Sequence, residues 1–387
     1  MPEGFRSKKV VVLGSTGSIG ESSLKVARDI PDRMEIVGLA ANSSVDDLAR
    51  QINEFSVKQG CLHDPTGLDR LASRVPGDVA LHTGGEGLVE LATMPEADIV
   101  LIAIVGVAGL RPALAAIEAG KDIAVASKEI LVMAGEAVMT AAREKGVQVL
   151  PVDSEHNAIF QCLEGKSPNQ VSRLILTASG GPFRELPSDE LKRVTKARAL
   201  RHPTWEMGQK ITIDSATLFN KGLEMIEARW LFDIEMERVD VIVHPQSIVH
   251  SMVEFVDGSI LAQLSTPDMC FPIQYAVTWP ERVPNSLPPL DFAELARLDF
   301  EEPRRADFPA LDLARRAGTV GGTLPAVMNA ANEVAVGAFL EERIAFPGIW
   351  ETVEATMEAH DSTASPSLDE IIDADEWARR KAGENVA

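Results

Sequence analysis

The chain has 387 residues, 45% of them apolar and 25% charged, which is the composition of a soluble globular protein and excludes a disordered one. Its formal net charge of -21 argues against nucleic-acid binding, because phosphate backbones require clustered Lys and Arg. No apolar stretch is long enough to span a bilayer and no signal peptide precedes the first strand, so we expect a cytoplasmic protein without membrane contact.

Short β-branched runs alternate with helical patterns between Lys8 and Leu150. This alternation predicts a parallel sheet with helices on both faces, the Rossmann-like doubly wound α/β fold, for a first domain at 1-150. We expect strands at 10–13, 34–40, 59–62, 79–82, 98–104, 123–126 and 147–150. Helices are expected at 18–29, 45–54, 109–119 and 129–145.

A glycine-rich turn, Gly14-Ser-Thr-Gly17-Ser-Ile-Gly20, follows the first strand and opens the first helix. Its glycines allow a tight turn and a close approach to a pyrophosphate, and the helix N-terminus supplies amide donors. The position in the first βα unit favours dinucleotide binding. The alternative is a glycine-rich turn that binds no ligand.

The end of the second strand bears on the choice between NAD and NADP. An acidic residue that binds the ribose of NAD is expected about 20 residues after the glycine turn. The chain instead reads Ala40-Ala41-Asn42-Ser43-Ser44, with no carboxylate to repel a 2′-phosphate and no Arg or Lys to attract it. We therefore predict NADP, held here by Asn42 and Ser43.

Ser127, Lys128 and Glu129 follow a later strand, at the carboxyl edge where ligands of doubly wound sheets lie. A role at the site and a surface ion pair at a helix start are both open for Lys128 and Glu129.

Three carboxylates indicate a metal site. Asp153 and Glu155 lie two apart after an apolar run, so an extended backbone would point both the same way. Glu224 follows Asn220 and Lys221 at the expected start of a helix, which places an amide, an ammonium and a carboxylate around one turn. Oxygen ligands favour Mg²⁺ or Mn²⁺ over zinc. The alternative for Asp153 and Glu155 is an exposed turn without a metal, where isolated acids often lie.

A set of short polar donors could hold a phosphate dianion, although each alone could be a turn or cap residue, with Ser215 a possible helix N-cap. The set is Ser179, Ser215, Asn220 and Lys221. The segment 201–208 places His202 and Trp205 in a Pro- and Gly-bounded loop, the composition of a lid over substrate. Structural roles for both residues are the alternative.

After Pro151 the regular alternation of strand and helix patterns is replaced by a mixed order of helices and strands. We expect an α+β catalytic domain at 151-279, with strands at 239–244, 251–255 and 260–265, the last two joined by a turn at Asp257-Gly258. A proline-rich linker at 280-309 and a small helical C-terminal domain at 310-387 should follow, with helical spacing at 310–343, 348–360 and 367–383.

Several long strings together resemble the 1-deoxy-D-xylulose 5-phosphate reductoisomerase family, nearly end to end. Besides the glycine turn, they are Pro151-Val-Asp-Ser-Glu-His-Asn-Ala-Ile-Phe-Gln161, Ser179-Gly-Gly-Pro-Phe-Arg184, Asn220-Lys-Gly-Leu-Glu-Met-Ile-Glu-Ala-Arg-Trp230, His244-Pro-Gln-Ser247 and Asn329-Ala-Ala-Asn-Glu333.

The resemblance implies NADPH-dependent conversion of 1-deoxy-D-xylulose 5-phosphate to 2-C-methyl-D-erythritol 4-phosphate, a step of the non-mevalonate isoprenoid pathway, by a homodimer. It implies Mg²⁺ or Mn²⁺, with Co²⁺ as a further option, on Asp153, Glu155 and Glu224. Substrate contacts would come from Ser154, Lys128, the phosphate donors and the lid residues His202 and Trp205, with Lys128 and His202 also serving catalysis. Cofactor contacts would come from Thr16, Gly17, Ser18, Ile19, Asn42, Ser43, Ser127 and Glu129, where Ser127 replaces the family's usual Asn.

Two other classes of protein fit parts of the pattern. A metal-dependent aldolase or isomerase would use the carboxylates but not the glycine turn. A non-catalytic NADP-binding scaffold would use the turn but not the carboxylates. A measurement of NADPH binding would distinguish the aldolase or isomerase from the predicted oxidoreductase. A turnover assay would distinguish the non-catalytic scaffold from it.

Overall fold

The computed structural model describes residues 6–202, 205 and 207–386. The chain forms two compact units, each assembled from segments distant in sequence. The first unit comprises 1–130, 136–157 and 268–288, and the second comprises 131–135, 158–267 and 289–387. Within the described ranges, no helix has the length and apolar content needed to cross a membrane.

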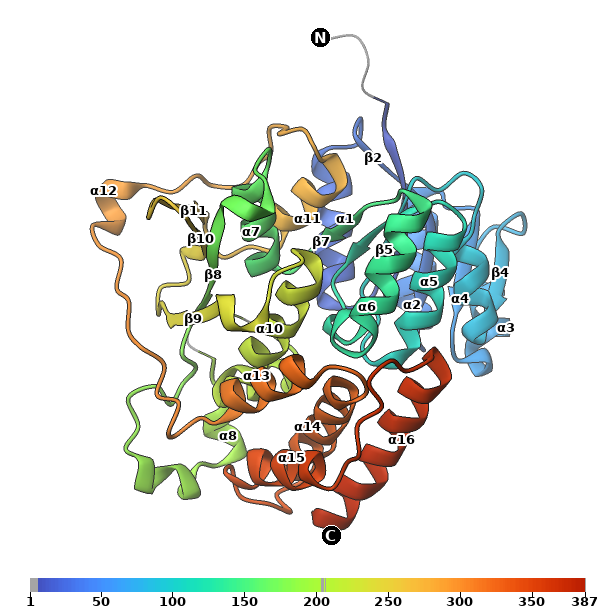
Figure 1. Cartoon of the computed structure of the whole chain (residues 1–387). Helices are drawn as coiled ribbons and strands as arrows, with labels where there is room; N and C mark the ends of the chain where they lie inside the picture. The colour runs from blue at the N-terminus through green and yellow to red at the C-terminus, as the bar shows by residue number, and fades with distance from the viewer. Residues whose placement is uncertain (1–5, 203–204, 206, 387) are drawn as a thin grey trace. The chain divides into compact units, whose positions relative to one another are not determined.

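The first unit is built on a seven-stranded parallel sheet (Figure 1). Its strands, in the order β4-β3-β2-β1-β5-β6-β7, are β1 (Lys8–Leu13), β2 (Met34–Ala41), β3 (Gln59–Leu62), β4 (Ala80–Thr83), β5 (Ile99–Ile102), β6 (Asp122–Val125) and β7 (Val149–Pro151). The strand order reverses direction between β1 and β5, so their carboxyl ends flank the topological switch point where nucleotides bind. The predicted doubly wound fold is confirmed, with every expected strand within two residues of its observed bounds.

Helices of this unit are α1 (Ser18–Asp29), α2 (Val45–Phe55), α3 (Leu68–Ala72), α4 (Gly84–Ala92), α5 (Leu110–Glu118) and α11 (Cys270–Thr278). The expected helices at 18–29, 45–54 and 109–119 are present as α1, α2 and α5, whereas no bounds were predicted for α3, α4 and α11. All four residues of β5 are buried, as are the last four of β1, which explains why these strands read as unbroken apolar runs.

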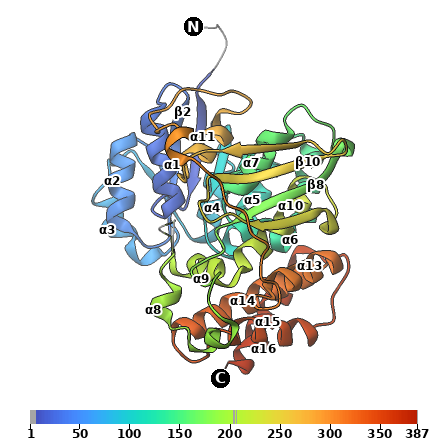
Figure 2. The same cartoon turned by 90° about the vertical axis from the view of Figure 1, so that its left-hand side faces the viewer.

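The second unit contains a mixed four-stranded sheet in the order β11-β10-β8-β9 (Figure 2). Its strands are β8 (Val171–Ala178), β9 (Val239–Val243), β10 (Val249–Phe255) and β11 (Ile260–Leu264). The expected strands and the Asp257-Gly258 turn are present, while β8 is an addition. β8 pairs in parallel with β9 and antiparallel with β10, so it holds the sheet together.

Helices of the second unit pack with its sheet around one apolar core, in which the ring centroids of Phe183 and Phe346 are 5.2 Å apart. They are α8 (Lys196–Ala199), α9 (Gln209–Thr217), α10 (Phe219–Leu231), α13 (Ala310–Val320), α14 (Leu324–Leu340), α15 (Gly348–Glu358) and α16 (Leu368–Asn385). The short helix α12 (Phe292–Leu295) has no buried residue and contributes none to this core. Figure 1 shows α13 to α16 in orange and red, grouped at the C-terminal end of the chain. The division into a catalytic domain, a linker and a helical domain stays a prediction.

Two helices carry the chain from one unit to the other. The helix α6 (Lys128–Lys145) contributes residues 131–135 to the second unit and has non-helical dihedral angles at Ala134. The helix α7 (Ser154–Leu163) begins in the first unit and continues in the second from residue 158. Lys128 begins α6, Ser154 and Glu155 begin α7, and Asn220, Lys221 and Glu224 lie in the first two turns of α10 (Phe219–Leu231).

Candidate functional site

The glycine turn has the geometry expected of a phosphate-binding turn. Gly14 has φ +94°, and a Cβ atom there would lie 2.4 Å from the Ala103 carbonyl oxygen, so only glycine fits between β1 and the loop after β5. The helix α1 begins at Ser18, and its N-cap residue is Gly17, which has no side chain to cap the first turn. No N-cap oxygen therefore competes for the N-terminal amides of α1, which suit a pyrophosphate. The predicted contacts Thr16, Gly17, Ser18 and Ile19 are all at least partly accessible.

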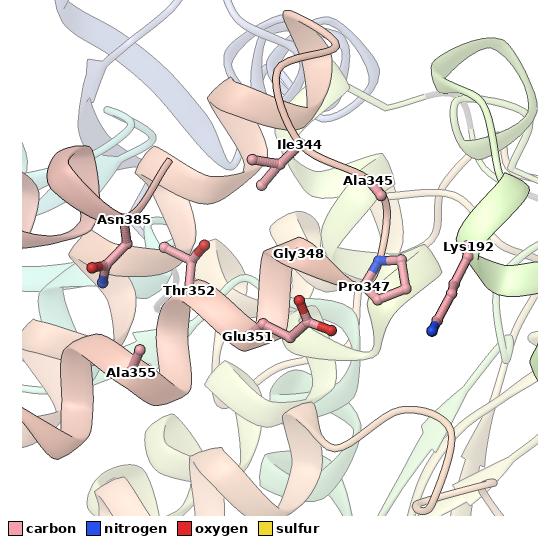
Figure 3. Close-up of a pocket in the computed structure, with 9 residues that line it drawn as sticks. All are labelled: Lys192, Ile344, Ala345, Pro347, Gly348, Glu351, Thr352, Ala355 and Asn385. Atoms are coloured by element: carbon pink, nitrogen blue, oxygen red, sulfur yellow. The ribbon is translucent and has the colours of Figure 1, made fainter. Parts of the chain in front are cut away.

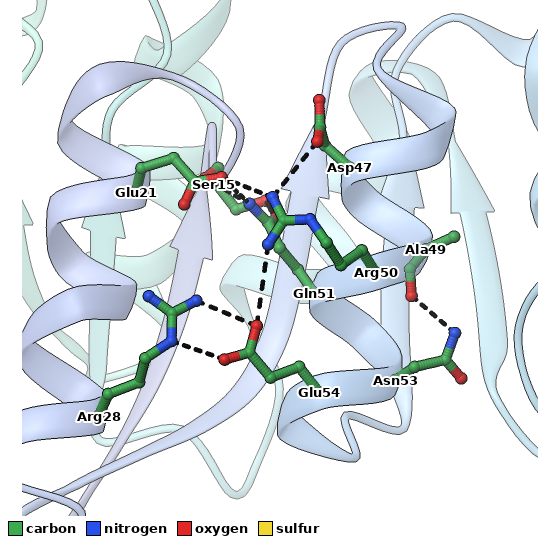
Figure 4. Close-up of polar contacts among 9 residues, drawn as sticks. All are labelled: Ser15, Glu21, Arg28, Asp47, Ala49, Arg50, Gln51, Asn53 and Glu54. Atoms are coloured by element: carbon green, nitrogen blue, oxygen red, sulfur yellow. Dashed lines mark hydrogen bonds and ion pairs between the residues drawn. The ribbon is translucent and has the colours of Figure 1, made fainter.

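A buried glutamine on α2 holds this turn in place (Figure 4). The Ser15 hydroxyl donates to Gln51 Oε1 at 2.6 Å, and Gln51 Nε2 donates back to the Ser15 carbonyl at 3.1 Å, with both residues fully buried. Gln51 Nε2 also lies 2.8 Å from a Glu21 carboxylate oxygen that pairs with Arg50. The Glu21 charge, close to the anion-binding helix start, is thus compensated. Sequence reasoning missed Gln51, which lies 36 residues from Ser15.

The other predicted cofactor residues occupy two different environments. Asn42 and Ser43 directly follow β2 and are exposed. Ser127 is 5% exposed, and its hydroxyl hydrogen-bonds the Ile104 carbonyl. Ser127 therefore ties the loop after β5 to the start of α6. Glu129, in the first turn of α6, is 7% exposed, so the alternative of a surface ion pair with Lys128 does not hold.

The two carboxylates after β7 lie close together. Asp153 and Glu155 each offer an oxygen, and these atoms lie within 4.8 Å of one another. The expected extended backbone is wrong, because Glu155 lies in the first turn of α7. The Asp153 carboxylate accepts a hydrogen bond from the Glu155 amide at 3.2 Å and so starts the helix as an Asx residue does. The turn brings together two acids that an extended strand would also have aligned.

A lysine and a serine contact this acidic pair. Lys128, at the beginning of α6, forms an ion pair with Asp153, and their side chains are 11% and 17% exposed. The Ser154 hydroxyl donates to a Glu155 oxygen at 2.5 Å. The first unit therefore combines an ammonium, a hydroxyl and two carboxylates around one point, a donor set suited to a hard divalent cation and a hydroxylated ligand.

The third predicted carboxylate lies in the first two turns of α10, as expected. Glu224 is 1% exposed, accepts from Asn220 Nδ2 at 2.6 Å, and forms a buried ion pair with Lys221. Asn220 Oδ1 is buried and has no hydrogen-bond partner among the described residues. An unsatisfied buried oxygen beside a carboxylate is costly unless a ligand, ion or water meets it. The buried polar side chains at the start of α10 are therefore of the kind found in binding sites.

His202 joins two of the predicted phosphate donors. Its Nε2 atom lies 3.0 Å from both Ser179 Oγ and Ser215 Oγ, while its Nδ1 accepts from the Trp205 amide at 2.9 Å. The hydrogen of the neutral ring must then be on Nε2. Ser215 lies in the last turn of α9, so the alternative that it is a helix N-cap is wrong. Of the expected lid, Pro203, Thr204 and Glu206 are outside the described residues.

A cavity elsewhere in the second unit contains none of the predicted site residues (Figure 3). It is lined by Lys192, Ile344, Ala345, Pro347, Gly348, Glu351, Thr352, Ala355 and Asn385.

A doubly wound sheet with a phosphate-binding turn at its switch point, and polar groups at the ends of later strands, defines the class of Rossmann-like nucleotide-dependent oxidoreductases. Comparison with models of protein families identifies one family within this class. Residues 10–135 match 1-deoxy-D-xylulose 5-phosphate reductoisomerase, and 149–232 and 264–381 match two models of C-terminal domains of the same enzyme. The chain belongs to the 1-deoxy-D-xylulose 5-phosphate reductoisomerase family.

Individual relatives are similar to this chain over nearly its whole length. The enzyme of that name from Geobacter metallireducens is 53% identical over 98% of this chain and 99% of its own, and that from Pelotomaculum thermopropionicum is 51% identical over 96% and 97%. The structure of the Zymomonas mobilis enzyme in complex with NADPH has a TM-score of 0.92 at 46% identity, covering 98% of this chain and 99% of its own. A reductoisomerase complex with NADPH, fosmidomycin and magnesium has a TM-score of 0.91 at 41% identity over 98% of both chains.

The protonation of His202 provides a test of the phosphate-donor cluster. Burial lowers the pKa of His202 from 6.5 to about 4. Histidine ring NMR should show one resonance, absent in His202→Gln, that titrates near pH 4 and whose titration moves to higher pH with inorganic phosphate, because the negative charge of a bound phosphate favours the imidazolium.

The same pKa sets a stability window. Between pH 6.5 and about 4 the unfolded chain binds more protons at His202 than the folded chain does, so the free energy of unfolding falls as pH decreases through this window. Urea unfolding of His202→Gln should lack that part of the decrease. Titration of the His202 ring near pH 6.5, unaffected by phosphate, would contradict the assigned cluster.

Proposed function

We propose that the protein catalyses the NADPH- and divalent-metal-dependent conversion of 1-deoxy-D-xylulose 5-phosphate to 2-C-methyl-D-erythritol 4-phosphate, in the non-mevalonate isoprenoid pathway. The observation that carries the proposal is end-to-end similarity to enzymes of this name, combined with an intact acidic pair beside Lys128. Neither a nicotinamide-independent aldolase nor a non-catalytic scaffold would need both the glycine turn and this pair.

Asp153, Glu155 and Glu224 would hold the divalent cation. All three are acidic oxygen donors, the set that Mg²⁺, Mn²⁺ and Co²⁺ accept more readily than zinc does. A bound metal would supply Lewis-acid polarisation of the substrate ketone and a template for its neighbouring hydroxyl. The Ser154 hydroxyl is close enough to Glu155 to orient both that carboxylate and a substrate hydroxyl.

Ser179, Ser215, Asn220 and Lys221 would bind the substrate phosphate. Three hydrogen-bonding side chains and one ammonium match a dianion. His202 already contacts both serines and would add its Nε2 hydrogen, and Trp205, whose amide holds the His202 ring, would pack on the substrate. Binding energy from the phosphate, remote from the reacting carbons, orients the substrate for the chemical step.

The cofactor would lie along the carboxyl edge of the parallel sheet. Thr16 to Ile19 would bind its pyrophosphate, and Asn42 and Ser43 would meet the adenosine 2′-phosphate. Ser127 would act through the loop that it tethers, and Glu129 would lie beside that loop. Lys128 holds its positive charge beside Asp153, where it can stabilise negative charge that develops on a substrate oxygen during rearrangement.

We also infer a homodimer. The strand β11 lies at the edge of the sheet beside β10, and its residues Leu261 and Ile260 are 44% and 49% exposed. Val256, directly after β10, is 69% exposed. An exposed apolar edge strand favours pairing with another chain. Light scattering should give twice the chain mass, with the monomer mass for Leu261→Lys. A monomeric wild-type chain would contradict the inference. A cytoplasmic location likewise stays a prediction.

Replacing one proposed metal ligand tests the function. Glu224→Gln keeps the shape of the side chain but removes its charge, and we expect a loss in kcat of roughly 100-fold or more, because metal polarisation contributes several kcal/mol. The affinity for NADPH, measured by NADPH fluorescence, should change less than about twofold, since Glu224 is not among the proposed cofactor contacts.

The assay is steady-state NADPH oxidation with 1-deoxy-D-xylulose 5-phosphate and Mg²⁺. Glu237→Gln, which changes an exposed glutamate of the same unit, is the matched control and should retain full activity. Metal-dependent turnover that survives in Glu224→Gln would show that the ligand assignment is wrong.

A further inference from the structure

The motif Asn329-Ala-Ala-Asn-Glu333 has no role in the proposed chemistry, yet it places three polar residues in an apolar helix. Asn329 and Asn332 on α14 are both fully buried, among neighbours such as Val327, Met328 and Val336. Burying an amide is unfavourable unless it makes hydrogen bonds. The partners of these residues should therefore reveal what the motif does.

The two asparagines contact different parts of the second unit. Asn332 Nδ2 donates to Asp214 Oδ1 on α9 at 2.8 Å, across 118 residues of sequence, and Asp214 is itself 1% exposed. Asn329 Nδ2 donates instead to Glu333 on its own helix at 3.0 Å. Glu333 in turn pairs with Arg379 of α16. Of the two, Asn332 is the one that joins α14 to α9.

Asp214 is well placed to transmit this contact. It directly precedes the proposed phosphate donor Ser215 on α9, and its second carboxylate oxygen pairs with Lys210 one turn earlier at 2.8 Å. Asn332 and Lys210 together occupy both oxygens of Asp214. Because Lys210 lies on α9 itself, it is the bond from Asn332 that ties α9 to α14 directly before Ser215.

The other proposed phosphate donors depend on the same helix. Gly181 has φ +66°, and a Cβ atom there would lie 2.9 Å from both the Ser215 carbonyl oxygen and the Ala216 Cα atom. The loop that carries Ser179 thus lies directly on the α9 backbone. At the same C-terminal end, α9 meets α10 through Leu218, which caps both helices, one turn before Lys221. A shift of α9 would consequently displace all of these donors.

We propose that Asn332 is a positioning residue for the phosphate site, acting through Asp214 on the placement of Ser215. This inference rests on the proposed function, because it concerns the substrate phosphate. The amide is suited to the task, since it donates to a carboxylate that already accepts from Lys210. An acid at the same position would oppose Asp214, and an apolar side chain would leave that oxygen of Asp214 without this bond.

The test compares two asparagines on one helix. Asn332→Leu removes the bond to α9, whereas Asn329→Leu removes an equally buried amide and leaves that bond intact. For Asn332→Leu we expect about tenfold higher KM for 1-deoxy-D-xylulose 5-phosphate and about tenfold weaker inorganic phosphate binding, measured by thermal shift, because small misplacements of binding groups are costly. KM for NADPH should be unchanged.

Asn329→Leu should lower the melting temperature but keep the phosphate affinity within about twofold of wild type, since it removes a hydrogen bond to Glu333 and leaves the bond to α9 intact. If Asn332→Leu does not fold, Asn332→Ser takes its place. The expected result is the same: a higher KM for 1-deoxy-D-xylulose 5-phosphate and an unchanged KM for NADPH. Equal phosphate affinity in the Asn332 and Asn329 variants would overturn the inference.

Exchanging donor and acceptor provides a rescue experiment. The double variant Asn332→Asp with Asp214→Asn restores a bond of reversed polarity, so it should bind phosphate more tightly than either single variant. A double variant no better than the weaker single one would contradict the inference. If wild type itself neither binds phosphate nor converts the sugar phosphate, the proposed function fails. If wild type does both and only the Asn332 comparison fails, the positioning role alone is wrong.

Discussion

The site depends on two carboxylates, Asp153 partly buried and Glu224 fully buried, that are held beside lysines. In the first unit Lys128 pairs with Asp153, and in the second Lys221 pairs with Glu224, with both side chains of the second pair almost fully buried. Buried charge is tolerated only when it is paired and hydrogen-bonded, and this requirement is severe in a chain whose net charge is -21. The local positive charge that an anionic substrate requires is thus already placed beside the acids that would bind a metal.

Each ion pair lies where a helix begins, and the fold explains why. Parallel strands end together at one edge of the sheet, so Lys128 after β6 and Asp153 after β7 meet although they are 25 residues apart. Lys221 and Glu224 are neighbours on one helical face instead. Binding groups set at the starts of rigid elements are held more precisely than groups on loops, which suits a reaction that requires exact placement of substrate and cofactor.

Sequence reasoning predicted those features that local pattern determines. The parallel sheet follows from short apolar runs alternating with helical spacing, and the glycine turn and the Asn220-Lys221-Glu224 helix start lie where expected. The strand β8 was missed, and so was the turn at Asp153, where one backbone hydrogen bond to a side chain decides between strand and helix. The alternative of Ser215 as a helix N-cap was wrong, because a serine beside a helix can lie at either end.

Contacts between residues distant in sequence could not be predicted in this way. Gln51 binds Ser15 across 36 residues, and Asn332 binds Asp214 across 118. A lone polar residue in a helical pattern gives no sign of its partner, since the partner is set by how whole helices pack. The resemblance to a family supplied functional roles for Ser179, Lys128 and their neighbours, but it assigned none to these two supporting residues.

Mn²⁺ binding measured by electron paramagnetic resonance tests most directly whether Asp153, Glu155 and Glu224 hold one cation. After chelator treatment, wild-type protein should bind about one Mn²⁺ per chain, and Mg²⁺ should compete for that site, because both ions prefer oxygen ligands. Asp153→Asn should weaken this binding by roughly tenfold or more, since a charged ligand contributes over 1 kcal/mol. Unchanged affinity and stoichiometry in Asp153→Asn would contradict the account.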